Sequence, residues 1–289
     1  MGVTMFMLFM LYVAVFGALI AVGVSAVLVL VIAAVVIFVQ YWFSASIALY
    51  AMGGREVSAS QAPQLHAVVD RLCAMANMRK PRVAIASSDI PNAFATGRNP
   101  NNAVICATTG ILRRLNEQEL EAVLAHELSH VAHRDVAVMT IASFLGIVAG
   151  VLTRIALYAD VFGFDFSGND GDQAALIELA VLVVSALVYA ISFLLTRALS
   201  RYRELAADRS GAILIGRPSI LASALVKVTG EMARIPTRDL RSAEHFNAFY
   251  FAPAIARGVS LSTLFSTHPP LQKRLDQLAK LESEMNRPA

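Results

Sequence analysis

Two histidines and a glutamate form a pattern that is typical of zinc peptidases. His126, Glu127 and His130 give the sequence H-E-x-x-H. Residues four apart lie on the same face of an α-helix, so both imidazoles can point toward one metal ion. Glu127 lies beside the first ligand, where its carboxylate can act as a general base for water. The alternative is a chance occurrence of the pattern on an ordinary amphipathic helix.

The motif requires a helix, and the residues around it predict one. Asn116 is the predicted N-cap, and Glu119 is its reciprocal partner in a capping box. Apolar side chains then recur at helical spacing and predict a buried face, formed by Leu120, Val123, Leu124, Leu128 and Val131.

A catalytic zinc usually has three protein ligands, so a third is needed. A third histidine of the metzincin type is excluded because position 136 is Val136. Glu204 and Asp208 lie one helical turn apart, so Glu204 can be a ligand while Asp208 accepts a ring proton from a ligating histidine. The competing interpretation is a solvated, charged helix face, and spacing alone does not decide between the two. His133 is a weaker candidate, and we interpret it as a polar residue at the helix end.

The composition indicates an integral membrane protein. Of the 289 residues, 57% are hydrophobic and 16% are charged, whereas soluble domains have about 25% charged residues. The net charge of +3 comes without a basic run, so nucleic-acid binding is not expected. Cys73 and Cys106 are predicted to be buried, and no disulfide framework is expected.

Four apolar runs are long enough to cross a bilayer. Residues 4–43 contain no charged side chain and predict two spans, at 5–22 and 26–43. A cleaved signal peptide is disfavoured because no basic side chain precedes the run. Two further runs lie at 137–158 and 174–196. A buried helical hairpin in a soluble core is the alternative for this second pair.

Arginine positions predict the orientation in the membrane. The acidic loop at 160–172 has no Lys or Arg, whereas Arg55, Arg134 and Arg197 flank the other side of the spans. Arg154 is the one basic residue that indicates the opposite orientation. The positive-inside rule therefore predicts a multi-pass protein of the cell membrane with both termini and the H-E-x-x-H motif in the cytoplasm. The acidic loop lacks the ligand spacing of an EF-hand, so we interpret it as a solvated loop rather than a calcium site.

These observations predict a mainly α-helical integral membrane protein with a small β-sheet and a cytoplasmic zincin-type metalloprotease domain. Short strands are expected at 82–87 and 103–107. The predicted parts are a transmembrane hairpin at 1–52, the first part of the protease domain at 53–136, a second transmembrane pair at 137–197, and the second part of the protease domain at 198–289.

Four motifs occur in order along the chain and together resemble one family. They are N-A-F-A-T-G at 92–97, H-E-L-S-H-V-x-x-R-D at 126–135, S-R-x-R-E-x-x-A-D at 200–208, and S-T-H-P-P-x-x-x-R-L at 266–275. The chain resembles the HtpX family of membrane zinc metalloproteases, which is related to the CAAX prenyl-protein endopeptidases. The resemblance covers essentially the whole chain.

The resemblance implies a role for each matching residue at the metal. One Zn²⁺ per subunit would be bound by His126, His130 and Glu204. Glu127 would be the general base, and Asp208 would hydrogen-bond a ligating histidine. Arg274, from the last motif, would form a salt bridge in the site region.

The resemblance also implies how substrate is bound. The strand that edges the cleft would contain Asn92, Ala93, Phe94, Ala95 and Thr96, and a substrate backbone would add to it as an extra strand. His268 would stabilise the oxyanion, although a helix-entry residue before two prolines is the alternative. The implied substrates are membrane proteins or misfolded proteins, cleaved in quality control or stress response.

Two other classes of function compete with a peptidase. A zinc-stabilised scaffold would not need the intact base Glu127, because structural zinc sites close the fourth position with protein. A transporter would need polar or broken spans near the middle of the bilayer, and the predicted spans are neither.

Overall fold

The motif helix belongs to a part of the chain that the structure describes continuously. The computed structural model describes residues 6–7, 31, 34–35, 38–140, 142, 171–232 and 268–287, with only the backbone for 171–182, 185 and 232. The chain divides into two units, one formed by 1–39 with 139–199 and the other by 40–138 with 200–289. All four motifs have described residues in the second unit.

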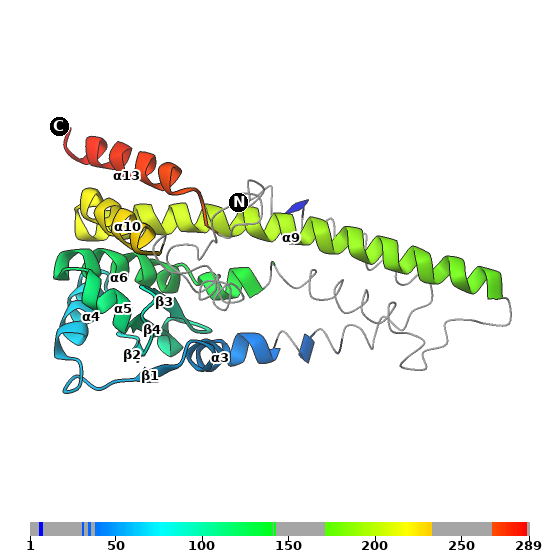
Figure 1. The fold of residues 1–289 in the computed structure, drawn as a ribbon, viewed down its shortest axis with the longest axis horizontal. Coiled ribbons are helices and arrows are strands. Elements are labelled where there is room, and N and C mark those ends of the chain that lie inside the picture. Colours follow the sequence, from blue (N-terminus) through cyan, green and yellow to red (C-terminus); the bar gives the residue numbers. More distant parts are fainter. Residues whose placement is uncertain are drawn as a thin grey trace. The chain divides into compact units, whose positions relative to one another are not determined.

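A four-stranded mixed sheet supports the motif helix (Figure 1). Its strands are β1 (Gly54–Glu56), β2 (Arg82–Ala86), β3 (Ala93–Thr96) and β4 (Val104–Thr108), in the order β1-β2-β4-β3. The central pair β2–β4 is parallel, and the two outer pairs are antiparallel. The two predicted strands are confirmed as β2 and β4, whereas β1 was not predicted. Strand β3 lies at an edge of the sheet.

Side chains alternate between the two faces of the sheet, as the pleat requires. One face packs into the core with the helices α4 (Pro63–Met75) and α6 (Glu117–Ala132), and it includes Val83, Ala93, Ile105 and Ala107. The other face packs against α3 (Ser44–Ala51), and it includes Ala84, Ala86, Phe94, Val104 and Cys106. The sheet is therefore covered on both faces, and both cysteines are buried as predicted.

The start of α6 is fixed by the predicted capping box. The Oδ1 of Asn116 accepts from the Glu119 N–H at 2.9 Å, and Glu119 Oε2 accepts from the Asn116 N–H at 3.0 Å. The predicted apolar face is buried throughout, at Leu120, Val123, Leu124, Leu128 and Val131. A short helix, α5 (Thr109–Arg114), precedes α6.

Three further helices complete the second unit around α6. Helix α10 (Pro218–Met232) packs on α6 opposite the sheet, and α13 (Leu271–Met285) packs on α10 (Figure 1). Helix α9 (Gly171–Ile215) contributes residues to both units. The mainly helical class with a small sheet is thus confirmed.

The predicted membrane spans lie mostly beyond the described residues. Within the described ranges, no helix combines the length and the apolar composition that crossing a membrane requires. The spans predicted at 5–22 and 137–158 and the acidic loop fall outside these ranges for most of their length, and the span at 26–43 for half of its length. The span predicted at 174–196 falls within α9. The four-part division of the chain stays a prediction.

Glu119 couples the start of α6 to α10 through a buried carboxylate. Burial alone would raise the pKa of Glu119, but hydrogen bonds from Lys227, the Asn116 N–H and Ser223 outweigh it and lower the pKa. Lys227 Nζ lies 2.9 Å from Oε2, and the Ser223 hydroxyl donates to Oε1 at 3.1 Å. Because the folded pKa is depressed, ionised Glu119 stabilises the fold above the ordinary value of 4.5, and this contribution is lost as the pH falls through the folded pKa.

We predict that Glu119→Gln lowers the free energy of unfolding at neutral pH by about 1–2 kcal/mol, the scale of losing a helix cap. It should also reduce the loss of stability on acidification below pH 4.5. Denaturant unfolding at a series of pH values measures both effects. The control is Glu117→Gln, whose side chain is 72% exposed in the same first turn. Equal pH dependence in Glu119→Gln and the wild type would contradict the role of this carboxylate.

Candidate active site

The three predicted ligands lie together in the second unit. The Nε2 atoms of His126 and His130 on α6 lie 3.2 Å apart. The carboxylate of Glu204 on α9 lies 3.6 Å from His126 Nε2 and 3.4 Å from His130 Nε2. One donor atom from each of the three residues lies within 4.8 Å of the others. Glu204 is buried, so a solvated helix face does not describe it.

A glycine allows α9 to approach α6 at this point. A Cβ atom added at Gly211 would lie 2.8 Å from the backbone nitrogen of His126 and 2.9 Å from its Cα. Such contacts are too short for any side chain. Gly211 therefore lets the helix that supplies Glu204 pack directly on the backbone of the motif helix.

The Nδ1 atom of each motif histidine contacts the carboxylate of an aspartate. His126 Nδ1 lies 2.9 Å from Oδ1 of Asp208, the residue expected to accept a ring proton, and His130 Nδ1 lies 2.5 Å from Asp135 Oδ2. Such partners fix the tautomer and the ring orientation of a metal-binding histidine. The Asp135 contact was not predicted. It forms because α6 ends at Ala132 and Arg134 adopts a left-handed φ of 54°, which turns the chain back toward His130.

Each of these aspartates is in turn bound by a buried arginine. Arg274 donates from Nε and from its terminal nitrogen to the two oxygens of Asp208, at 2.7 and 2.6 Å. Arg203 contacts the carboxylate of Asp135 and donates to its backbone carbonyl at 3.2 Å. Burial alone would raise the pKa of Asp208, but the charge and hydrogen bonds of Arg274 outweigh it and lower the pKa to about 2. Burial lowers the pKa of Arg203 to about 10.

His268 lies against the third predicted ligand. Its Nδ1 is 2.8 Å from Glu204 Oε2, and the ring is buried. Burial alone would raise the pKa of Glu204, but the charge of His268 and hydrogen bonds from His126, His130 and His268 hold the pKa well below its ordinary range. His268 therefore belongs to the cluster, whereas His133 is the exposed C-cap of α6 and lies outside it.

The predicted base faces the edge strand of the sheet. Glu127 is 5% exposed, and its Oε2 accepts from the Ala95 N–H at 3.0 Å. Burial raises the pKa of Glu127. The other predicted substrate-binding residues lie on or just before β3. Asn92 pairs through its backbone with Thr108, Phe94 packs on the α3 side of the sheet, and Ala93 and Thr96 are buried.

The residues present fit a divalent metal ion. Two imidazoles and a carboxylate are a donor set that catalytic zinc uses. Four carboxylates meet here, those of Glu127, Asp135, Glu204 and Asp208, and two guanidiniums oppose them, those of Arg203 and Arg274. With the ligating imidazoles of His126 and His130 neutral, as metal binding requires, the carboxylates outnumber the guanidiniums by two, and the charge of His268 offsets one of these. The cluster therefore keeps an excess of negative charge, which a bound metal cation would offset.

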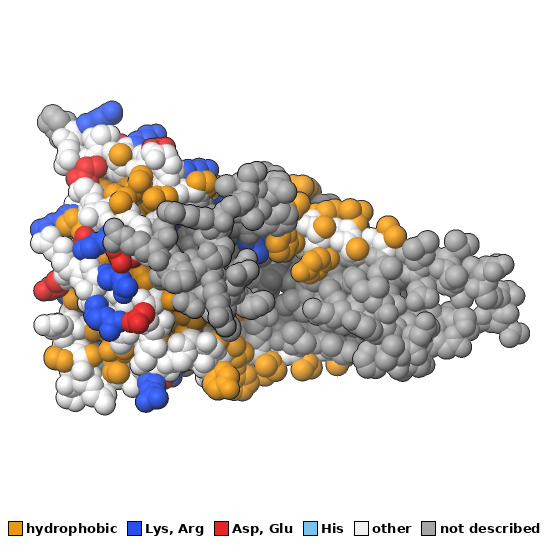
Figure 2. Space-filling view, in the orientation of Figure 1, with side chains coloured by type: hydrophobic (Ala, Val, Ile, Leu, Met, Phe, Trp, Pro, Cys, Tyr) orange, Lys and Arg blue, Asp and Glu red, His pale blue; other side chains and the backbone are white. Residues whose placement is uncertain are grey.

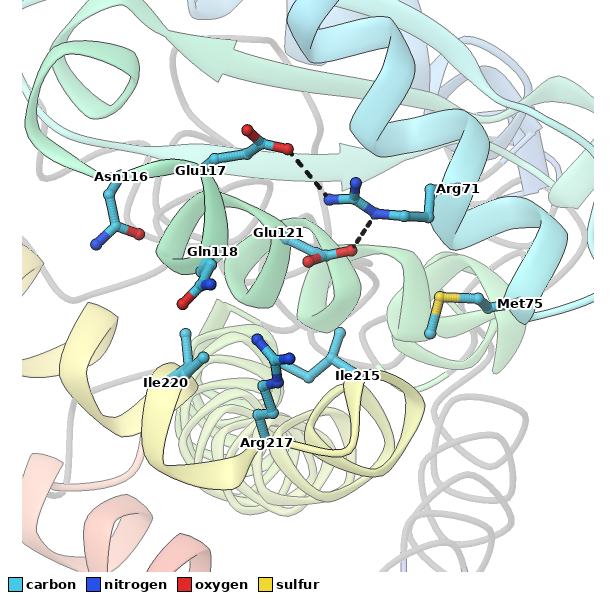
Figure 3. Close-up of a pocket in the computed structure, with 9 residues that line it drawn as sticks. All are labelled: Arg71, Met75, Asn116, Glu117, Gln118, Glu121, Ile215, Arg217 and Ile220. Carbon is cyan, nitrogen blue, oxygen red and sulfur yellow. Dashed lines mark hydrogen bonds and ion pairs between the residues drawn. The ribbon is translucent and has the colours of Figure 1, made fainter.

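A pocket elsewhere in the same unit is not the reactive centre (Figure 3). It has a volume of about 640 Å³ and lies at the start of α6 and the end of α9. Its lining contains no histidine or cysteine. Its carboxylates are engaged, because Arg71 binds Glu121 at 2.6 Å and Glu117 at 3.4 Å.

The fold and the clustered residues define a metallopeptidase, and the comparisons agree. The model of peptidase family M48 matches residues 59–282, and the chain belongs to this family. It is similar to Protease HtpX homolog 1 of Streptomyces coelicolor, at 61% identity over 99% of this chain and 92% of the relative. It is also similar to Protease HtpX homolog of Moorella thermoacetica, at 52% identity over 99% of this chain and 94% of the relative.

A solved structure shares the fold. The crystal structure of Ste24p from S. mikatae superposes with a TM-score of 0.57 and 16% identity, over 96% of this chain and 62% of that one. The resemblance to HtpX proteases is therefore confirmed, and the chain is a metalloendopeptidase.

Proposed function

We propose that this metalloendopeptidase uses zinc to hydrolyse peptide bonds in membrane or misfolded proteins, with Glu127 as the general base. The observation that supports the proposal best is the convergence of His126, His130 and Glu204 next to the buried Glu127. One zinc ion would be held by those three residues. When bound, zinc supplies a Lewis acid that polarises the scissile carbonyl and makes water more acidic.

The chain's own residues would move the proton. Glu127 takes a proton from the attacking water and returns it to the leaving amine. Its raised pKa suits both steps, because a base that is poised closer to neutral pH also serves as the acid. The Ala95 N–H holds Oε2 of Glu127 and leaves Oε1 to face the attacking water. His268, held by Glu204, would stabilise the negative charge that develops on the carbonyl oxygen.

Strand β3 would bind the substrate backbone. In an antiparallel pair, alternate residues direct their backbone groups toward the partner strand. Asn92 bonds to Thr108 through its backbone, so the groups of Ala93 and Ala95 face the open edge. Because Glu127 already accepts from Ala95, an extended substrate added at this edge lies directly beside the base.

We further propose that the enzyme is a multi-pass protein of the cell membrane, with its active site on the cytoplasmic side. The uncharged stretch at 4–43 supports insertion. Hydrophobic side chains also gather over α3 (Figure 2). They include Phe43, Ile47 and Tyr50, which recur on one helix face and are 49%, 45% and 92% exposed. Trp42 stacks under the Arg98 guanidinium at 4.0 Å, a pair suited to a lipid headgroup region.

The competing function is a zinc-stabilised scaffold without catalysis. Its ligands would be the same, but a structural site has no need of a buried carboxylate beside the metal. Glu127 is such a carboxylate, and its Oε2 accepts a hydrogen bond from the Ala95 N–H of the edge strand. This position favours catalysis.

We predict that Glu127→Gln retains zinc and loses cleavage of an unfolded protein substrate by about 10²–10⁴-fold, the range for a general base. Glu204→Gln should lose both zinc and cleavage. Zinc content and single-substrate cleavage rates of the purified variants measure this. Glu117→Gln, on the exposed start of the same helix, is the control and should match the wild type. A wild type that holds zinc but cleaves no unfolded protein would favour the scaffold.

The orientation can be tested with engineered cysteines, because both native cysteines are buried. A membrane-impermeant maleimide applied to intact cells should label Asp165→Cys, in the predicted external loop. It should label Gln118→Cys, at the exposed start of α6, only after the cells are lysed. Labelling of Gln118→Cys in intact cells would contradict a cytoplasmic active site.

A further inference from the structure

We propose that Arg203 is a positioning residue that orients the metal-binding ring of His130 by acting through Asp135. This inference rests on the proposed zinc site. Asp135 and Arg203 belong to two of the sequence motifs, but neither has a part in the mechanism derived above.

Arg203 holds Asp135 at two points. Its guanidinium contacts Oδ1, while Oδ2 lies 2.5 Å from His130 Nδ1, so the two carboxylate oxygens are divided between the arginine and the histidine. A second guanidinium nitrogen donates to the Asp135 backbone carbonyl at 3.2 Å. Arg203 thereby fixes both the side chain and the main chain of a residue that lies past the end of α6, beyond the reach of the helix's own hydrogen bonds.

The same arrangement occurs independently on the other histidine. There, Asp208 lies on His126 Nδ1, and Arg274 binds both oxygens of Asp208. The aspartates come from different places, one directly after the turn that follows α6 and one from α9, and the arginines come from α9 and α13. Two branches with the order histidine, aspartate, arginine thus converge on one point from different elements. A role at the metal explains this repetition. If Arg203 and Asp135 only stabilised the end of α6, the other histidine would not need the same kind of partners.

The placement of Arg203 also links two ligands. It precedes Glu204 directly in α9, so one helix segment provides a ligand and, through Asp135, holds the ring of another. Neighbouring residues on a helix point about 100° apart. Glu204 therefore faces the metal-binding atoms while Arg203 reaches around the ring to its far side. A shift of α9 would move both ligands together.

The test is a double-mutant cycle on metal affinity in the full-length protein. Zinc affinity is measured by competition with a chelator for the wild type, Asp135→Asn, Arg203→Met and the double variant. We expect Asp135→Asn and Arg203→Met each to weaken zinc binding by about 10–100-fold. If Arg203 acts through Asp135, the double variant binds zinc no more weakly than Asp135→Asn alone.

A spectroscopic reading separates positioning from general destabilisation. With Co²⁺ bound in place of zinc, the visible absorption bands of the metal should shift in Arg203→Met. In Arg203→Lys they should return toward the wild-type spectrum. Arg209→Met is the matched control, because Arg209 lies on the same helix with a 55% exposed side chain and only a 3.6 Å ion pair to Glu284. It should leave affinity and spectrum unchanged.

Other outcomes overturn the inference. Wild-type affinity and spectrum in Arg203→Met would show that Arg203 has no effect on the site. Losses that multiply in the double variant would show that it does not act through Asp135. If Arg203→Met does not fold, Arg203→Lys and its double variant with Asp135→Asn complete the cycle and decide by the same criteria. A wild type that binds neither Zn²⁺ nor Co²⁺ would instead refute the proposed function on which this inference rests.

Discussion

The charges buried around the motif helix do not cancel within the protein. The carboxylates of Glu127, Asp135, Glu204 and Asp208 outnumber the guanidiniums of Arg203 and Arg274 by two. Burying an uncompensated charge is costly, so a fold that gathers these groups needs further positive charge, from His268, a bound cation or protons, to balance them. Burial alone would lower the pKa of His126, but hydrogen bonds that its ring donates to Asp208 and Glu204 outweigh burial and raise the pKa. The residues of the site therefore fit a bound cation.

This requirement explains why distant parts of the chain must meet. Helix α6 provides both histidines and the base, α9 provides Glu204 and both Arg203 and Asp208, and the segment leading into α13 provides His268. The sheet holds the base from the other side through Ala95. The helices can come this close because Gly211 has no side chain at the crossing. Packing and electrostatics thus select the same arrangement.

Features that depend on neighbouring residues could be predicted from the sequence. The capping box at Asn116, the buried face of α6 and the convergence of His126 and His130 all follow from helical spacing. Spacing alone did not decide whether Glu204 is a metal ligand, because a ligand and an exposed acid have the same sequence pattern until burial is known. Strand β1 was missed because its three residues, Gly-Arg-Glu, have no apolar alternation. Asp135 was missed because its contact depends on the left-handed turn at Arg134, which no helical periodicity indicates.

The most direct test of this account is X-ray absorption spectroscopy on the purified, metal-loaded protein. We predict one zinc per chain, with only nitrogen and oxygen neighbours at about 2.0–2.1 Å, from two imidazoles and one carboxylate. The cysteines lie elsewhere in the core, so no sulfur should bind the metal. A zinc–sulfur distance of about 2.3 Å, or a protein that folds fully and holds no divalent metal, would contradict a site built to balance its charge with zinc.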